Sequence, residues 1–327
     1  MDRLAIWRHV GCAMALVIAA PVCAAIPQSE RDVLLALYAS TDGGNWESQQ
    51  GWNGAAGTEC SWYGITCDAE QAHVIGIDLF LNTLGGSLPP IDGLTGLASF
   101  DVSYNHLTGA IPPVESLVKL THLDVSFNQL SGNVPPLANL TNLDAVYLAR
   151  NYLSGHMPAL AGLSVLRYFD AHSNYLSGPI PPLTGLPYLQ TFDVSQNRLT
   201  GSIPPLGEMP RLIYFLVSDN LLSGPFPSLD GLTYLFTFNI RGNRLSGPVP
   251  AFTDQSRLMY FSIDDNELSG NLPDPTVLEK IESARVCPNR FNPVPSEAWD
   301  ILTRTRPWYR DCLPPPPEQI FGDGFDG

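Results

Sequence analysis

Apolar and polar positions recur along this chain with a period of 23 residues. An asparagine marks the period nine times, at positions 82, 105, 128, 151, 174, 197, 220, 243 and 266. Around each asparagine the sequence follows the template L-x-x-L-x-x-L-x-V-x-x-N-x-L-x-G-x-I-P, with other apolar residues at some of the apolar places. A fixed period of this length predicts an architecture of stacked repeats.

Each repeat contains a short strand followed by a proline-rich return segment. Apolar residues alternate with polar ones before the asparagine, as at Leu123 and Val125, which predicts a strand with one buried face. Proline pairs such as Pro135-Pro136 follow, and proline lacks the amide donor that a helix needs. We therefore predict an α/β repeat solenoid, curved, with a parallel sheet on its concave side and a non-helical convex side.

The asparagine and a column of phenylalanines both have structural explanations. An amide side chain among buried leucines must have its hydrogen bonds satisfied, so we expect the asparagines to bond backbone groups of neighbouring repeats as a ladder. We interpret the phenylalanines as a stack in the core, with an aromatic ligand slot as the alternative. They stand five residues before the asparagine, at positions 100, 169, 192, 215, 238 and 261.

The segments that flank the repeats predict the domain organisation. Residues 1–25 run from basic to apolar to small residues, which is typical of a signal peptide, with an uncleaved membrane anchor as the alternative. Residues 26–73 form an N-terminal cap, in which Ser29-x-x-Asp32 resembles a capping box that opens a helix. Nine repeats fill residues 74–274. A degenerate tenth repeat and a C-terminal cap follow at 275–312, and then a proline-rich spacer and acidic tail at 313–327.

Four cysteines lie outside the predicted signal peptide. Their even number in an exported chain predicts disulfides, which we assign as Cys60–Cys67 and Cys287–Cys312. Metal ligation is the alternative, but no histidine stands near either pair at ligand spacing. The formal net charge of −15 disfavours nucleic acid, and we expect no metal ion, no cofactor and no membrane span in the mature chain.

The repeat resembles the plant-type leucine-rich repeat, and C-S-W-Y-G-I-T-C within residues 30–67 is similar to the N-terminal cap of such proteins. The resemblance covers residues 28–312. It implies a secreted or cell-surface protein, extracellular or periplasmic, similar to receptor-like kinase ectodomains and polygalacturonase inhibitors, which bind ligands on the concave face. Two features differ, since the period is 23 rather than 24 residues and no membrane span or kinase follows the cap. The ending F-G-D-G-F-D-G is similar to tails on exported gammaproteobacterial proteins.

Four columns of side chains are expected on the concave face, at six, four, two and one residues before each asparagine. In the first repeats they hold small or repeated residues such as Ser99, Asp101 and Ser103. From the fourth repeat onward larger polar residues appear, of the types that interfaces favour, with ordinary solvated surface as the alternative. The predicted ligand-binding residues are Tyr147, Arg150, Tyr168, His172, Tyr214, Asp219, Arg241, Tyr260 and Asp264.

These features predict a non-catalytic recognition module for a protein or peptide. Asp170, His172 and Ser195 could be drawn as a catalytic triad, but Asp and Ser recur at equivalent places in other repeats, so we expect no enzymatic activity. Glycan binding is an alternative, because Tyr168, Tyr214 and Tyr260 occur in alternate repeats and would lie roughly 9–10 Å apart. A structural spacer without a ligand is a further alternative.

Overall fold

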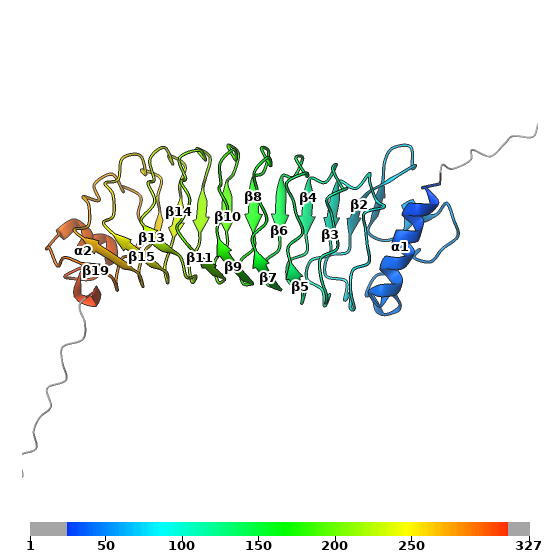
Figure 1. Ribbon diagram of the computed structural model, residues 1–327, viewed down its shortest axis with the longest axis horizontal. Helices are drawn as coiled ribbons and strands as arrows, with labels where there is room; N and C mark the ends of the chain where they lie inside the picture. The colour runs from blue at the N-terminus through cyan, green and yellow to red at the C-terminus, as the bar shows by residue number, and fades with distance from the viewer. Residues whose placement is uncertain (1–24, 313–327) are drawn as a thin grey trace, which may run out of the picture.

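The computed structural model describes residues 25–312, which form an elongated, curved stack of repeats with a helix at each end (Figure 1). The predicted signal peptide, except for Ala25, and the predicted tail at 313–327 lie outside the described residues. None of the helices in the described part of the chain is long and apolar enough to cross a membrane.

An eleven-stranded sheet runs the length of the stack. Its first strand pairs antiparallel with the second, and the others are parallel with equivalent residues of successive repeats in register, such as Phe192 beside Phe215. Nine strands come from the predicted repeats, one from the tenth repeat and one from the cap. In order they are β1 (Ile65–Cys67), β2 (Val74–Asp78), β3 (Ser99–Asp101), β4 (His122–Asp124), β6 (Ala145–Tyr147), β8 (Tyr168–Asp170), β10 (Thr191–Asp193), β12 (Tyr214–Leu216), β14 (Thr237–Asn239), β16 (Tyr260–Ser262) and β18 (Ser283–Arg285).

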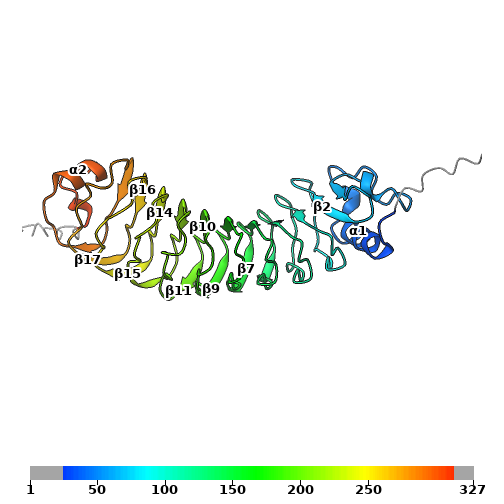
Figure 2. The ribbon, with the colours of Figure 1, turned by 90° about the horizontal axis from the view of Figure 1, so that it is seen from above.

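The return segments are non-helical, as predicted, and those of repeats three to ten contribute two four-stranded sheets on the outer side of the curve (Figure 2). Their strands are β5 (Ser131–Asn133), β7 (Tyr152–His156), β9 (Tyr175–Pro179) and β11 (Arg198–Thr200), then β13 (Ser223–Pro225), β15 (Arg244–Gly247), β17 (Glu267–Gly270) and β19 (Arg290–Phe291). Within residues 25–312 the helices are confined to the caps. They are α1 (Gln28–Ser40), α2 (Glu297–Thr303) and the 3₁₀ turns η1 (Gly43–Asn45), η2 (Glu59–Ser61) and η3 (Arg310–Cys312).

The phenylalanine column is a core stack, as predicted. The rings of Phe169, Phe192 and Phe215 lie parallel, with successive centroids 5.8 Å apart. Phe238 and Phe261 continue the stack at 5.6 and 6.1 Å, and all these side chains are fully buried. The core leaves no room for an aromatic ligand at this column.

The asparagine ladder is confirmed from Asn105 onward, whereas the side chain of Asn82 bonds the backbone of Ser48 in the N-terminal cap. At Asn128, Nδ2 donates to the carbonyls of Val102, Val125 and Ser126 at 2.9, 3.2 and 3.1 Å. Its Oδ1 accepts from the Leu107 amide of the preceding repeat at 2.9 Å. One side chain thus joins two repeats, so the strands of the concave sheet are held at fixed spacing and orientation.

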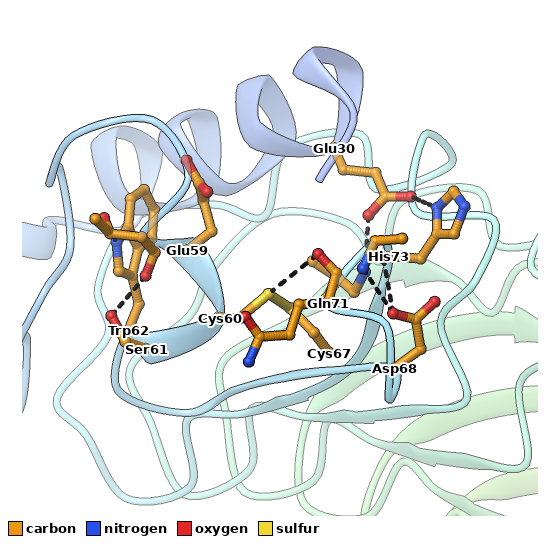
Figure 3. The surroundings of a disulfide bond; sticks show 12 residues. Glu30, Glu59, Cys60, Ser61, Trp62, Cys67, Asp68, Gln71 and His73 are labelled. Carbon is orange, nitrogen blue, oxygen red and sulfur yellow. Dashed lines mark hydrogen bonds and ion pairs between the residues drawn. A yellow bond between two sulfur atoms is a disulfide. The ribbon is translucent and has the colours of Figure 1, made fainter. Parts of the chain in front are cut away.

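The predicted capping box is absent from the start of helix α1. Helix α1 begins at Gln28, with Pro27 at the N-cap and no side-chain cap, so Ser29 lies inside the first turn. The acidic residue that matters here is Glu30, which is buried and accepts hydrogen bonds from His73 Nδ1 at 2.7 Å and from the Val74 amide at 2.8 Å (Figure 3). The capping-box prediction was therefore wrong, and this carboxylate ties α1 to the first repeat.

Both predicted disulfides are present, Cys60–Cys67 in the N-terminal cap and Cys287–Cys312 in the C-terminal cap (Figure 3 shows the first). At the C-terminal end α2 packs against β18. Trp299 and Trp308 are each 2% exposed there. The cap thus covers the apolar end of the stack.

Candidate functional site

Three of the predicted tyrosines occupy one position in alternate repeats. Tyr168, Tyr214 and Tyr260 are the first residues of β8, β12 and β16. Thr191 and Thr237 stand between them in the parallel register. Tyr214 and Tyr260 are 38% and 39% exposed, and Tyr168 is half-buried. The concave face therefore presents a regular column of large and small side chains.

Neighbouring side chains hold these tyrosines in place. Phe236, which the sequence analysis did not select, lies edge-on to Tyr214 and Tyr260 with ring centroids 5.9 and 5.6 Å away. The Tyr260 hydroxyl donates to Glu282 Oε2 at 2.8 Å, and this hydrogen bond raises the pKa of Tyr260. The Tyr168 hydroxyl donates to Gln190 at 3.2 Å. Pre-positioned aromatic side chains lose little freedom on binding a ligand.

Tyr147 and Arg150 belong to the fourth repeat but have different surroundings. Tyr147 ends β6, half-buried beside His122 at 5.6 Å between ring centroids, and burial raises its pKa. Arg150 has a left-handed backbone, with φ 54°, and its guanidinium lies 5.2 Å from the centroid of the Phe127 ring. It borders an open hollow of about 420 Å³, lined also by Asn128, Asn151, Tyr152, Ser173, Asn174, Tyr175 and Gln196.

His172 lies in a cluster of carboxylates at the centre of the concave face. Its Nδ1 is 2.7 Å from Asp170 Oδ1 and 3.8 Å from Asp193 Oδ2. The hydrogen bond that His172 donates to Asp170 raises the pKa of His172, and burial raises the pKa of Asp193. These three side chains offer ligand atoms within 4.8 Å of one another, as do Asp101, His122 and Asp124. Among the described residues, these two groups are the ones that could hold a metal ion. Within each group, the parallel register of neighbouring strands brings the side chains close to one another.

The serines near these carboxylates are bonded to aspartates. Ser195 Oγ donates to Asp193 Oδ1 at 2.6 Å, while His172 bonds to Asp170. Within residues 25–312 no hydrogen bond joins Ser195 to His172, so the nucleophile and base of a triad are not in contact. The same Asp–Ser pair recurs in the second, third and sixth repeats, with Oγ to Oδ1 distances of 2.7, 2.6 and 2.6 Å.

The ninth repeat carries the same two residue types in the opposite order. Ser262 stands four residues, and Asp264 two residues, before Asn266. The second of these positions is buried in several repeats, with Ser103 2% exposed and Asp264 6% exposed. The reversal therefore places a carboxylate where repeats two, three and seven bury a serine hydroxyl.

Arg241 neutralises this carboxylate only in part. Its Nε lies 3.2 Å from Asp264 Oδ2 and 3.1 Å from Asp265 Oδ2, so one guanidinium serves two acids. Asp264 Oδ1 is buried and has no hydrogen-bond partner. Burial raises the pKa of Asp264, and Arg241 opposes that effect. Asp219, in the seventh repeat, is exposed, with a left-handed backbone at φ 56°.

The predicted residues thus fall into local groups spread along the concave side. Tyr214 and Tyr260 both contact Phe236, and His172 contacts Asp170 and Asp193. Arg241 of the eighth repeat contacts Asp264 of the ninth, whereas Tyr147 and Arg150 lie far from them along the chain, in the fourth repeat.

An exposed aromatic strip in the first three repeats was missed by the sequence analysis. Phe80, Leu81 and Tyr104 are 46%, 58% and 44% exposed. The Tyr104 ring lies 5.4 Å from Phe80 and 4.0 Å from Phe127, parallel to the latter. The expectation of small residues in the first repeats holds at Ser99, Asp101 and Ser103 and fails in the last column. The available signal was the succession of large apolar residues immediately before the asparagines, at 81, 104 and 127.

Comparison with known proteins agrees with this geometry. A family model for the Leucine rich repeat N-terminal domain matches residues 27–68, and one for the Leucine Rich Repeat matches residues 119–140 and 188–208. The solenoid is therefore a leucine-rich repeat fold. Its cap, its repeats and its structural neighbours together make the chain a leucine-rich repeat protein of the plant type.

Solved plant structures are similar over most of the chain. The ectodomain of the receptor kinase GASSHO1/SCHENGEN3 from Arabidopsis thaliana, in complex with CASPARIAN STRIP INTEGRITY FACTOR 2, is 30% identical, with a TM-score of 0.77, over 83% of this chain and 34% of that chain. A plant ice-binding protein is 25% identical, with a TM-score of 0.62, over 83% of this chain and 90% of that one. The Arabidopsis receptor kinase HAESA, with the peptide hormone IDA and the co-receptor SERK1, is 26% identical, with a TM-score of 0.53, over 81% and 54%. No curated protein matches the chain.

Proposed function

We propose that this chain is a non-catalytic, extracellular recognition module that binds an extended basic segment of a protein or peptide along the concave face of repeats four to nine. The observation that carries the proposal is the composition of that face, where a column of tyrosines lies beside columns that carry acidic side chains. Such a surface offers aromatic contact area and attracts cationic groups. In the four concave columns of these repeats the acids are Asp170, Asp193, Asp219, Asp264 and Asp265, against Arg150 and Arg241.

The similar receptor ectodomains support a peptide or protein as the ligand class. Two of the structures described above hold a partner or a peptide hormone in their complexes. This chain spans 34% of the length of the GASSHO1/SCHENGEN3 ectodomain, so the partner itself does not transfer. The plant ice-binding protein has the same fold and another ligand, so the side chains of the face must decide the ligand.

A selection from displayed random peptides tests this proposal. The full mature chain should enrich peptides that contain Lys or Arg, and binding should weaken as salt is added, because exposed charges are screened. A variant with Tyr168→Ala, Tyr214→Ala and Tyr260→Ala should lose most of this binding. The control removes three exposed tyrosines elsewhere, Tyr63, Tyr188 and Tyr234, and should bind as wild type does. Equal binding by both variants would contradict the proposed face.

The tyrosine column also supports a second candidate, the binding of a glycan. Tyr168, Tyr214 and Tyr260 share one position in alternate strands, so their rings repeat at roughly 9–10 Å, a spacing that a sugar chain can bridge. A glycan array probed with the wild type and with the triple tyrosine variant separates the candidates. The absence of any tyrosine-dependent signal on the array would remove this one.

A further inference from the structure

A small polar cavity lies at the C-terminal end of the concave face, between the last repeats and the cap. Its volume is about 120 Å³, well above the roughly 10–15 Å³ that one water molecule needs. Asp264 and Arg285 line it from the repeats, and the cap contributes Thr303, Thr305 and Asp311. Ala284, Val286, Cys287 and Trp308 complete the lining.

One lining residue has an unsatisfied acceptor. Asp264 is 6% exposed, and its Oδ1 is buried without a partner, while Oδ2 is bonded to Arg241. Buried polar atoms in folded proteins nearly always have a hydrogen-bond partner, so an exception calls for a missing donor. The reversed order of Ser262 and Asp264 puts the carboxylate at a place that holds a serine in repeats two, three, six and seven.

The remaining polar groups of the cavity are richer in acceptors than in donors. Thr303 Oγ1 donates its hydrogen to the Trp299 carbonyl at 2.8 Å and accepts from the Thr305 amide at 3.3 Å, so it offers no donor to the cavity. In the lining the carboxylates of Asp264 and Asp311 outnumber the single guanidinium group, that of Arg285. An incoming group that carries N–H donors and a positive charge would balance both hydrogen bonding and charge.

We propose that this cavity binds the ammonium or guanidinium group of a basic side chain, with the Asp264 carboxylate as its principal acceptor. Asp264 belongs to the same column as His172 and Arg241, two residues before the asparagine, so the cavity continues the concave face. A peptide lying along that face reaches the cavity where the cap ends the groove. This placement of the basic side chain rests on the proposed function, whereas the chemical preference of the cavity can be tested without a peptide.

The test uses two small probes, Nα-acetyl-arginine methylamide and its neutral citrulline counterpart, titrated into the full mature chain and followed by NMR at the amides of Thr303 and Thr305. The arginine probe should give saturable shifts, and the citrulline probe should bind more weakly. Asp264→Asn should lower the affinity for the arginine probe about tenfold or more, the loss expected for one charge-assisted hydrogen bond. A second variant, Ser262→Asp with Asp264→Ser, restores the order of the regular repeats and should lose binding equally. Asp101→Asn, whose carboxylate is bonded to Ser103, is the matched control.

Each outcome decides between the claims. Equal affinity of wild type and both Asp264 variants, with thermal unfolding confirming that they fold, would overturn the proposal, as would the absence of any shift in wild type. If displayed basic peptides bind the face but do not depend on Asp264, the cavity fails and the proposed function stands. If the arginine probe binds and no peptide does, the cavity stands and the proposed function fails.

Discussion

Repeats two and nine carry the same pair of residue types at the same two strand positions, and the order of the pair gives them opposite properties. In repeat two the buried Ser103 donates to the partly exposed Asp101, so each side chain of the pair has a hydrogen-bond partner. In repeat nine the buried member is Asp264, and one of its oxygens has no partner. A solenoid can therefore turn a structural pair into a candidate binding group by exchanging two residues on an unchanged backbone.

The repeat that precedes each pair also differs. Arg241 stands before Asp264 and contacts it, whereas the equivalent residue before Ser103 is Phe80, an exposed aromatic. A buried carboxylate is tolerated in repeat nine because a guanidinium lies 3.2 Å away. The ninth repeat thus required two changes, the exchange itself and a cation supplied by its neighbour.

Moving the exchange into repeat two should have the largest effect on stability. A variant with Asp101→Ser and Ser103→Asp would bury a carboxylate beside Phe80 without a cation, and its free energy of unfolding should fall by about 3–5 kcal/mol. Denaturant unfolding measures this loss. Ser103→Ala is the control, and it should cost only about 1 kcal/mol because it removes a single hydrogen bond. An exchanged variant as stable as wild type would show that Arg241 is not required in repeat nine.

Breaking the asparagine ladder at the two repeats should give unequal losses. Asn128→Ala should cost about 1–3 kcal/mol, because buried carbonyls and an amide lose their partner. Asn266 makes equivalent bonds but is less buried, so water can replace part of them and Asn266→Ala should cost less. The two unfolding curves measured in the same denaturant decide this point, and a greater loss at Asn266 would contradict the ordering.

Restoring the regular order in repeat nine should stabilise the protein slightly. With Ser262→Asp and Asp264→Ser the buried place again holds a hydroxyl, and we expect a gain of about 1 kcal/mol from removing an unsatisfied acceptor. Thermal unfolding of this variant beside wild type measures the gain. A clear loss of stability would mean that the bond between Arg241 and Asp264 outweighs the unpaired oxygen.

Repeat five is an intermediate case and should give the smallest effect, visible as a dependence on pH. His172 replaces the serine of the pair and bonds to Asp170, which raises the pKa of His172 above 6.5. Protonation of a group whose pKa is raised by folding favours the folded state, so this contribution is complete below pH 6.5 and is lost as pH rises through the folded-state pKa. His172→Gln should remove this slope from unfolding curves measured across that range. The same slope in both proteins would exclude His172 as its source.

The repeats could be predicted from sequence because the same pattern of apolar and polar residues recurs in each of them. Asn128 predicts its own ladder bonds, and Phe192 its place in the stack, since every neighbour repeats the pattern. Glu30 could not be placed this way, because Glu30 and His73 lie in a cap that has no period, even though its other partner, Val74, begins the first repeat.

In the candidate site, too, residues at periodic positions could be predicted and residues outside the period could not. The columns of Tyr168, Tyr214 and Tyr260 follow from counting back from each asparagine, but Phe236 reaches them from outside the strand. Asp264 was selected as a surface residue of an interface, and the structure shows it 6% exposed in a cavity that the C-terminal cap helps to form. The Cys287–Cys312 bond was predictable, whereas the side chains that its loop brings to Asp264 were not.

The way the stack ends has a consequence for self-assembly. A parallel sheet generated by repeating one step contains no signal to stop, and each new strand presents the same unpaired edge to any chain that approaches. Helix α2 packs against β18, the last strand, and Trp299 and Trp308 are buried there. This packing ends the stack and hinders a second molecule from pairing with its last strand. The cap that shapes the cavity beside Asp264 therefore also keeps the solenoid from growing end to end into a fibre.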